Sequence, residues 1–72
     1  ELLLDQMERL SICIEMESWK KAEDYASSIK NMLPKENKEI CSLGLSLVLT
    51  VRRAEREQSL RILEKLIAKI KR

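Results

Sequence analysis

Hydrophobic positions recur along the chain with the spacing of amphipathic helices, and one stretch departs from that pattern. Residues 40–51, ICSLGLSLVLTV, contain no charged side chain, although 36% of the whole chain is charged. A helix over this stretch carries one apolar stripe, formed by Ile40, Leu43, Leu47 and Val51. Its other side is also largely apolar, with Cys41, Leu45, Val48 and Leu49 beside a thin polar strip of Ser42, Ser46 and Thr50. Because a helix that is apolar nearly all round must be buried nearly all round, we expect the central helix of a small bundle.

The first helix is predicted over residues 1–16. Its core stripe consists of Leu3, Met7, Leu10 and Ile14. Leu2, Ile12 and Met16 lie on the opposite side, where a solvated face is normally polar. We therefore expect these three side chains to contact a neighbouring part of a parent protein or another subunit.

The second helix is predicted over residues 18–33. Ser18 suits the N-cap position, and Pro34 ends the helix because it restricts the preceding residue and lacks a backbone N–H. The apolar arc is formed by Trp19, Ala22, Tyr25, Ala26, Ile29, Met32 and Leu33. The opposite arc is polar.

The third and fourth helices are predicted over residues 37–51 and 55–71. The apolar stripe of the third helix loses its phase after Val51 and resumes in a new phase at Leu60, so a turn is expected within Arg52–Glu57. One long bent helix is the alternative, because neither Gly nor Pro marks this boundary. Four helices with short connections predict an all-α, up-down-up-down antiparallel four-helix bundle.

The composition is that of one small helical domain covering residues 1–72. The chain begins at Glu1 rather than at a methionine and shows no signal peptide or membrane span, so we expect a domain of a longer protein. Cys13 and Cys41 lie on apolar helical faces without the spacing of a metal or redox motif. Two buried free thiols indicate a reducing, cytoplasmic location.

The net charge of +2 is unevenly distributed. Residues 1–36 hold five basic and eight acidic side chains, whereas residues 37–72 hold nine basic and four acidic ones. A weaker candidate is therefore an anionic-surface binder that uses Arg52, Arg53, Arg56, Arg61, Lys65 and Lys69. One Trp and one Tyr, without aromatic residues among the basic ones, do not favour nucleic-acid binding.

Few residues suit catalysis. The chain has no histidine, no glycine-rich phosphate loop and no spacing that pairs a nucleophile with a base. We expect a protein that is not an enzyme and that needs neither a cofactor nor a metal.

The segment Trp19–Asn31 resembles the second bundle helix of histidine-phosphotransfer (HPt) domains, which ends in Ala-His-x-Leu-Lys-Gly. Ala26, Ile29 and Lys30 match the Ala, Leu and Lys of that motif. Ser27 occupies the position of the phospho-accepting His, and Asn31 that of the Gly. The later segments, including Glu39-Ile40, Leu43-Gly44 and Leu47, resemble the third and fourth helices of the family in order and approximate spacing.

The resemblance implies an HPt-like domain of a two-component phosphorelay that docks receiver or sensor domains without accepting phosphate. A serine phosphate ester is stable, whereas the histidine phosphoramidate of a relay is readily reversed, so Ser27 cannot replace the His. The docking surface that the resemblance implies consists of Lys20, Glu23, Ser27, Lys30 and Asn31.

Two alternatives remain open. The spacing from Trp19 through Ala22 and Ala26 to Pro34 is also similar to the second helix of a tetratricopeptide repeat, although no 34-residue repeat follows. The other alternative is a structural oligomerisation bundle, a possible homodimer that associates through Cys41, Leu45, Val48 and Leu49 of the third helix. For the polar arc of the second helix, the simplest interpretation is a solvated helix face.

Overall fold

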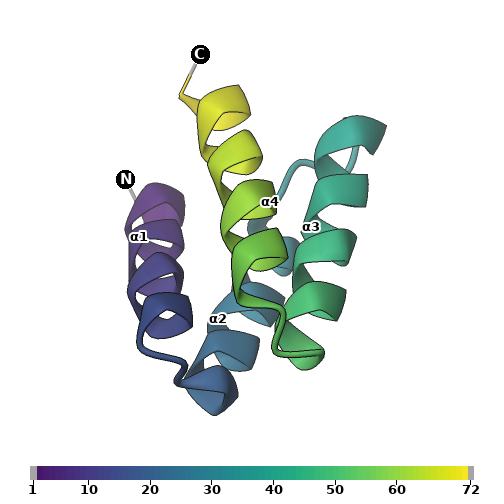
Figure 1. Cartoon of the computed structure of the whole chain (residues 1–72). Coiled ribbons are helices and arrows are strands. Elements are labelled where there is room, and N and C mark those ends of the chain that lie inside the picture. Colours follow the sequence, from purple (N-terminus) through teal and green to yellow (C-terminus); the bar gives the residue numbers. More distant parts are fainter. Residues whose placement is uncertain (1, 72) are drawn as a thin grey trace.

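The chain forms four helices that run alternately up and down, as predicted. The computed structural model describes residues 2–71. The helices are α1 (Leu2–Glu15), α2 (Trp19–Met32), α3 (Lys38–Arg52) and α4 (Arg56–Ile70). Each helix packs against the next one, and α4 packs back against α1 (Figure 1). The predicted all-α four-helix bundle is therefore confirmed.

The packing of α4 against α1 closes the four helices into one bundle. The alternative of one long helix is excluded, since α3 ends at Arg52 and α4 begins at Arg56.

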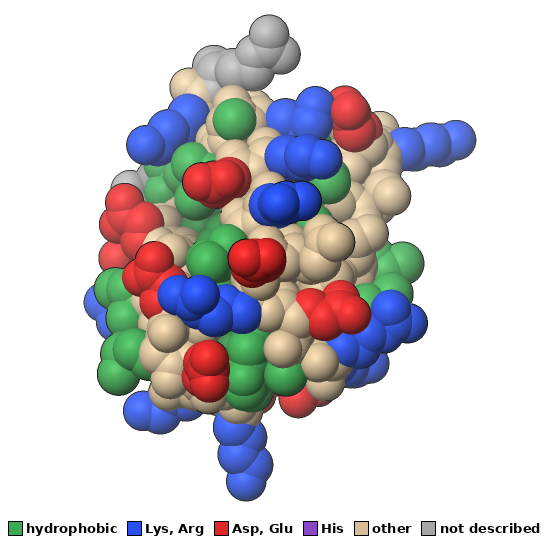
Figure 2. All heavy atoms as spheres, in the orientation of Figure 1, with side chains coloured by type: hydrophobic (Ala, Val, Ile, Leu, Met, Phe, Trp, Pro, Cys, Tyr) green, Lys and Arg blue, Asp and Glu red, His purple; other side chains and the backbone are tan. Residues whose placement is uncertain are grey.

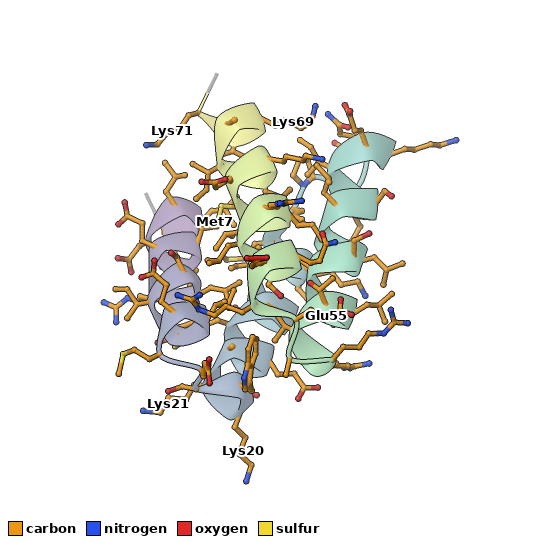
Figure 3. All side chains as sticks on the ribbon, viewed as in Figure 1. Met7, Lys20, Lys21, Glu55, Lys69 and Lys71 are labelled. Carbon is orange, nitrogen blue, oxygen red and sulfur yellow. The ribbon has the colours of Figure 1, made fainter. Side chains whose placement is uncertain are left out.

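The core is aliphatic and lies between all four helices. Met7, for example, is fully buried and lies between α1 and α4 (Figure 3). Alanine at positions 22 and 26 provides small surfaces on α2. The buried hydrophobic residues are Met7, Leu10, Ile14, Ala22, Ala26, Ile29, Leu33, Ile40, Leu47, Val48, Val51, Leu63 and Leu66.

The buried stripe of α3 is rotated toward α2 relative to the stripe predicted from the sequence. Leu43, which was expected in the core, is half-buried, whereas Gly44 and Val48 are buried. The cause is the close approach of α2 and α3: a Cβ atom at Gly44 would lie 2.5 Å from Leu33 Cδ1. Because Gly44 has no side chain, α2 can cover this flank of α3 and bury Val48 as well.

Two turns depend on residues in the left-handed helical region. Glu17 follows α1 with φ of 59°, and Ala54 follows α3 with φ of 56°. In the second turn, the backbone N–H of Glu55 donates to the carbonyl of Thr50 and that of Ala54 to Val51. This pattern ends a helix in the manner of the Schellman motif. The turn expected within 52–57 is confirmed, although no glycine marks it.

The other boundaries follow ordinary capping chemistry. Asn37 caps α3, and its Oδ1 accepts a hydrogen bond of 3.1 Å from the backbone N–H of Ile40. Ser18 occupies the N-cap of α2 as predicted, but its side chain makes no capping hydrogen bond. Leu33 is extended, as expected for a residue before proline.

The first helix has the exposed apolar side chains that its sequence predicts. Leu2, Ile12 and Met16 are 65%, 55% and 70% exposed. They lie opposite the stripe of Met7, Leu10 and Ile14. Within residues 2–71, no helix combines the length and the apolar character needed to cross a bilayer.

Candidate functional site

The polar arc predicted on α2 follows the flank of that helix which faces α3. Lys20, Lys30 and Asn31 are exposed, while Glu23 and Ser27 are half-buried. Lys20 lies near the start of the helix and extends away from the bundle (Figure 3). The helical spacing of Glu23, Ser27 and Lys30 places these three on one line beside α3.

An ion pair joins this line to α3. Arg52 Nε donates to Glu23 Oε2 at 2.9 Å, and the two side chains are 57% and 44% exposed. An ion pair with this exposure stabilises a fold by at most about 1 kcal/mol, because water and salt screen it. The pair also brings Arg52 beside Glu23, where its positive charge offsets that of the carboxylate. Arg52 was not predicted to belong to this site.

Lys30 lies at the closest approach of the two helices. A Cβ atom at Gly44 would be 3.8 Å from Lys30 Cγ, so the stem of Lys30 passes beside the glycine. Beyond the C-terminal end of α2, the thiol of Cys41 donates to the carbonyl of Pro34 at 3.3 Å. The two helices thus run antiparallel from the Glu23–Arg52 pair to the Cys41–Pro34 contact.

The self-association residues predicted on α3 do not all lie on the surface. Val48 is only 5% exposed and belongs to the core, so the expectation that it lies on an outer face is wrong. Cys41 is half-buried and hydrogen-bonded. Leu45 and Leu49 are 49% and 42% exposed, and they alone remain as an apolar ridge. The reason is the approach of α2 at Gly44, which sequence periodicity could not reveal.

The structure brings the two predicted sites together on one surface. Leu45, Leu49 and Arg52 follow each other at helical spacing on the same side of α3, and Arg52 pairs with Glu23 of α2. The exposed leucines therefore adjoin the polar line of α2. We define the α2–α3 face by Lys20, Glu23, Ser27, Lys30, Asn31, Leu45, Leu49 and Arg52.

Charge on the α2–α3 face is predominantly positive. Three basic residues, Lys20, Lys30 and Arg52, stand against one acidic residue, Glu23. An apolar ridge bordered by cations suits a partner whose own apolar patch is bordered by carboxylates. Between residues 2 and 71, no group of three or more His, Cys, Asp or Glu side chains is placed to hold a metal ion.

The basic residues that were predicted to bind an anionic surface, from Arg52 to Lys69, are interspersed with acidic ones. Lys69 Nζ lies 2.9 Å from Glu39 Oε1, and Arg52 is paired with Glu23. Figure 2 shows blue and red side chains side by side over the face that contains α4. Two of the six cations, Arg52 and Lys69, are thus paired with carboxylates of the bundle itself.

The flank of α2 that faces α1 holds a feature that the sequence did not indicate. Lys21, Asp24 and Tyr25 line an open hollow there. On α1, Arg9 Nε donates to Asp5 Oδ2 at 2.9 Å. The Asp5 carboxylate, and after it the nearby Tyr25 hydroxyl, raise the pKa of Arg9 above its ordinary value.

No protein-family model, no curated protein and no solved structure matches this chain. The fold is that of an all-α four-helix bundle.

Proposed function

We propose that this chain is a protein-interaction domain of a two-component phosphorelay that docks receiver or sensor domains through the α2–α3 face without accepting phosphate. The observation that carries the proposal is the joining of the two candidate sites by the Glu23–Arg52 pair. Apolar side chains that adjoin charged and polar ones are the usual composition of a protein-docking surface.

The class of partner rests on the HPt resemblance around Ser27. The bundle fold is consistent with that resemblance, and Ser27 lies in the middle of α2 beside Lys30. Lys30 is exposed and offers a cation to an acidic pocket, whereas the serine hydroxyl cannot carry a readily transferred phosphoryl group. Docking is therefore the proposed activity.

The proposal is tested by NMR titration of the isotope-labelled domain with receiver domains of its organism. Amide shifts are expected along the α2–α3 face, and Lys30→Glu and Leu45→Glu should each weaken binding by roughly tenfold or more, because each places a carboxylate against an acidic partner. Lys21→Glu is the matched control, since Lys21 is exposed on the other flank of the same helix. The absence of shifts with every receiver and sensor domain would refute the proposal.

Self-association through α3 is the second candidate, and the exposure of Leu45 and Leu49 favours it. Two features oppose it: Val48 is unavailable, and a second copy would bring Lys20, Lys30 and Arg52 toward the same cations. Sedimentation of the wild type and of Leu45→Glu tests this candidate. A dimer that Leu45→Glu dissociates would support it, and a dimer insensitive to Leu45→Glu would contradict it.

A further inference from the structure

A second surface, on α1, has a pattern that is complementary to itself. Leu2, Asp5, Arg9, Ile12 and Met16 follow each other at alternating intervals of three and four residues. The first four belong to α1 and Met16 directly follows its last residue, and we call the five together the outer face of α1. This spacing keeps successive side chains on one side of a helix and is the spacing of coiled-coil seams. The outer face lies opposite the buried stripe of Met7, Leu10 and Ile14.

The apolar members of this face are the most exposed large hydrophobic side chains in the described chain. Leu2, Ile12 and Met16 are 65%, 55% and 70% exposed, compared with 49% for Leu45. In Figure 1, α1 forms one edge of the bundle, and in Figure 2 hydrophobic side chains lie between charged ones along that edge. A second helix therefore has free access to the outer face.

The charged residues of this face indicate which partner it binds. Asp5 and Arg9 already form an ion pair within α1, at 2.9 Å, with side chains 49% and 58% exposed. If a second copy of α1 lies antiparallel, with the two-fold axis at the level of Met7, residues equally distant from position 7 face each other. Leu2 then meets Ile12 of the other copy, and Asp5 meets Arg9.

Other arrangements of the same two helices bring like charges together. A parallel pair places Arg9 beside Arg9 and Asp5 beside Asp5. An antiparallel pair centred on Arg9 opposes the two arginines directly. Since like charges in direct opposition destabilise an interface, the register centred on Met7 is the one of these three that opposes Leu2 to Ile12 and Asp5 to Arg9.

From this complementarity we infer that the outer face of α1 is a self-association surface whose partner is a second copy of this chain, paired antiparallel through α1. The contact is isologous, so each interaction occurs twice. Two helices of this length bury less than the roughly 1,200 Å² typical of stable complexes, so the dimer is weak and forms with increasing concentration. It leaves the α2–α3 face free and is independent of the proposed docking function.

The charged pair allows a decisive experiment by sedimentation velocity at concentrations up to the millimolar range. The wild type is expected to shift from monomer to dimer. Asp5→Arg alone and Arg9→Asp alone should each weaken the dimer by roughly tenfold or more, because each creates two like-charge contacts. An equimolar mixture of the two variants should restore the dimer as a heterodimer, since every like-charge contact then becomes an opposite-charge contact.

Ile12→Glu should also abolish the dimer, while Leu45→Glu on α3 should leave it intact. The four substituted residues are all exposed, so the variants should keep the helical circular dichroism of the wild type; they are Asp5, Arg9, Ile12 and Leu45. A wild type that stays monomeric at every concentration would overturn the inference. So would a dimer that Leu45→Glu dissociates, or a mixture of the two charge variants that stays monomeric.

Discussion

The hydroxyl of Ser59, at the start of α4, donates a hydrogen bond of 3.0 Å to Thr50 Oγ1, near the end of α3. Thr50 in turn donates to the carbonyl of Leu47, also at 3.0 Å. Ser59 is fully buried and is the one polar side chain in the core of the described residues. The two hydroxyl groups therefore join α3 to α4 directly beside the turn at Ala54.

We predict that Ser59→Ala lowers the free energy of unfolding by about 1 kcal/mol, the net value of a typical hydrogen bond. Urea unfolding measures this change. Ser42→Ala is the matched control: Ser42 is exposed on α3, and its substitution should change stability by less than about 0.5 kcal/mol. Equal effects at the two positions would show that the Ser59–Thr50 bond does not stabilise the fold.

The turn between α3 and α4 should be improved by glycine. Ala54 has φ of 56°, a region that costs a residue with a side chain about 1–2 kcal/mol and glycine almost nothing. The greater entropy of glycine in the unfolded chain offsets part of this gain. We therefore expect Ala54→Gly to raise the unfolding free energy by a net amount of about 0.5–1 kcal/mol. Thermal denaturation measures the change.

Ala68→Gly provides the control for that prediction. Ala68 is exposed within α4, where φ is negative and glycine should destabilise by about 1 kcal/mol. The free energy of unfolding is expected to rise with glycine at position 54 and to fall with glycine at position 68. A loss of stability at both would contradict the importance of the left-handed residue.

Gly44 should be tested together with Leu33. Gly44→Ala places a Cβ atom 2.5 Å from Leu33 Cδ1, and displacing a buried leucine costs about 1–3 kcal/mol, more than the roughly 1 kcal/mol that alanine gains in a helix. We expect a net loss of stability in the wild-type background. In Leu33→Ala, where the clash is absent, Gly44→Ala should instead stabilise by up to about 1 kcal/mol.

A double-mutant cycle from urea unfolding measures this reversal. Residues in contact show coupling, whereas independent sites give additive effects. If Gly44→Ala had the same effect in both backgrounds, the close approach of α2 and α3 at this point would be disproved.

Substitutions at Leu45 and Val48 should differ in their effect on stability, because Leu45 lies on the surface of α3 and Val48 lies in the core. Val48→Ala removes buried methyl groups and should lower the unfolding free energy by roughly 1–3 kcal/mol. Leu45→Glu should change it by less than about 0.5 kcal/mol, because the side chain is exposed. Urea unfolding of both variants distinguishes them, and a severe loss of stability in Leu45→Glu would place that residue in the core.

The helices themselves could be predicted from the sequence because local periodicity determines them. The predicted segments 1–16, 18–33, 37–51 and 55–71 agree with the observed helices to within one residue at each end, apart from residue 1, which lies outside the described residues. Pro34 fixed one boundary, and the change of apolar phase after Val51 fixed another. The exposure of Leu2, Ile12 and Met16 also followed from periodicity, because they lie opposite a complete apolar stripe.

Only the tertiary structure decided how the flanks of the helices meet. Val48 is buried because the absent side chain of Gly44 lets α2 approach. The hydroxyl of Ser59 tolerates burial because Thr50 accepts its hydrogen bond. The Glu23–Arg52 pair, which joins the two candidate sites, connects residues 29 positions apart. Periodicity assigns each residue an angle on its own helix, but burial at the edge of a stripe depends on the distance to the neighbouring helix, and that distance is set by side chains on both.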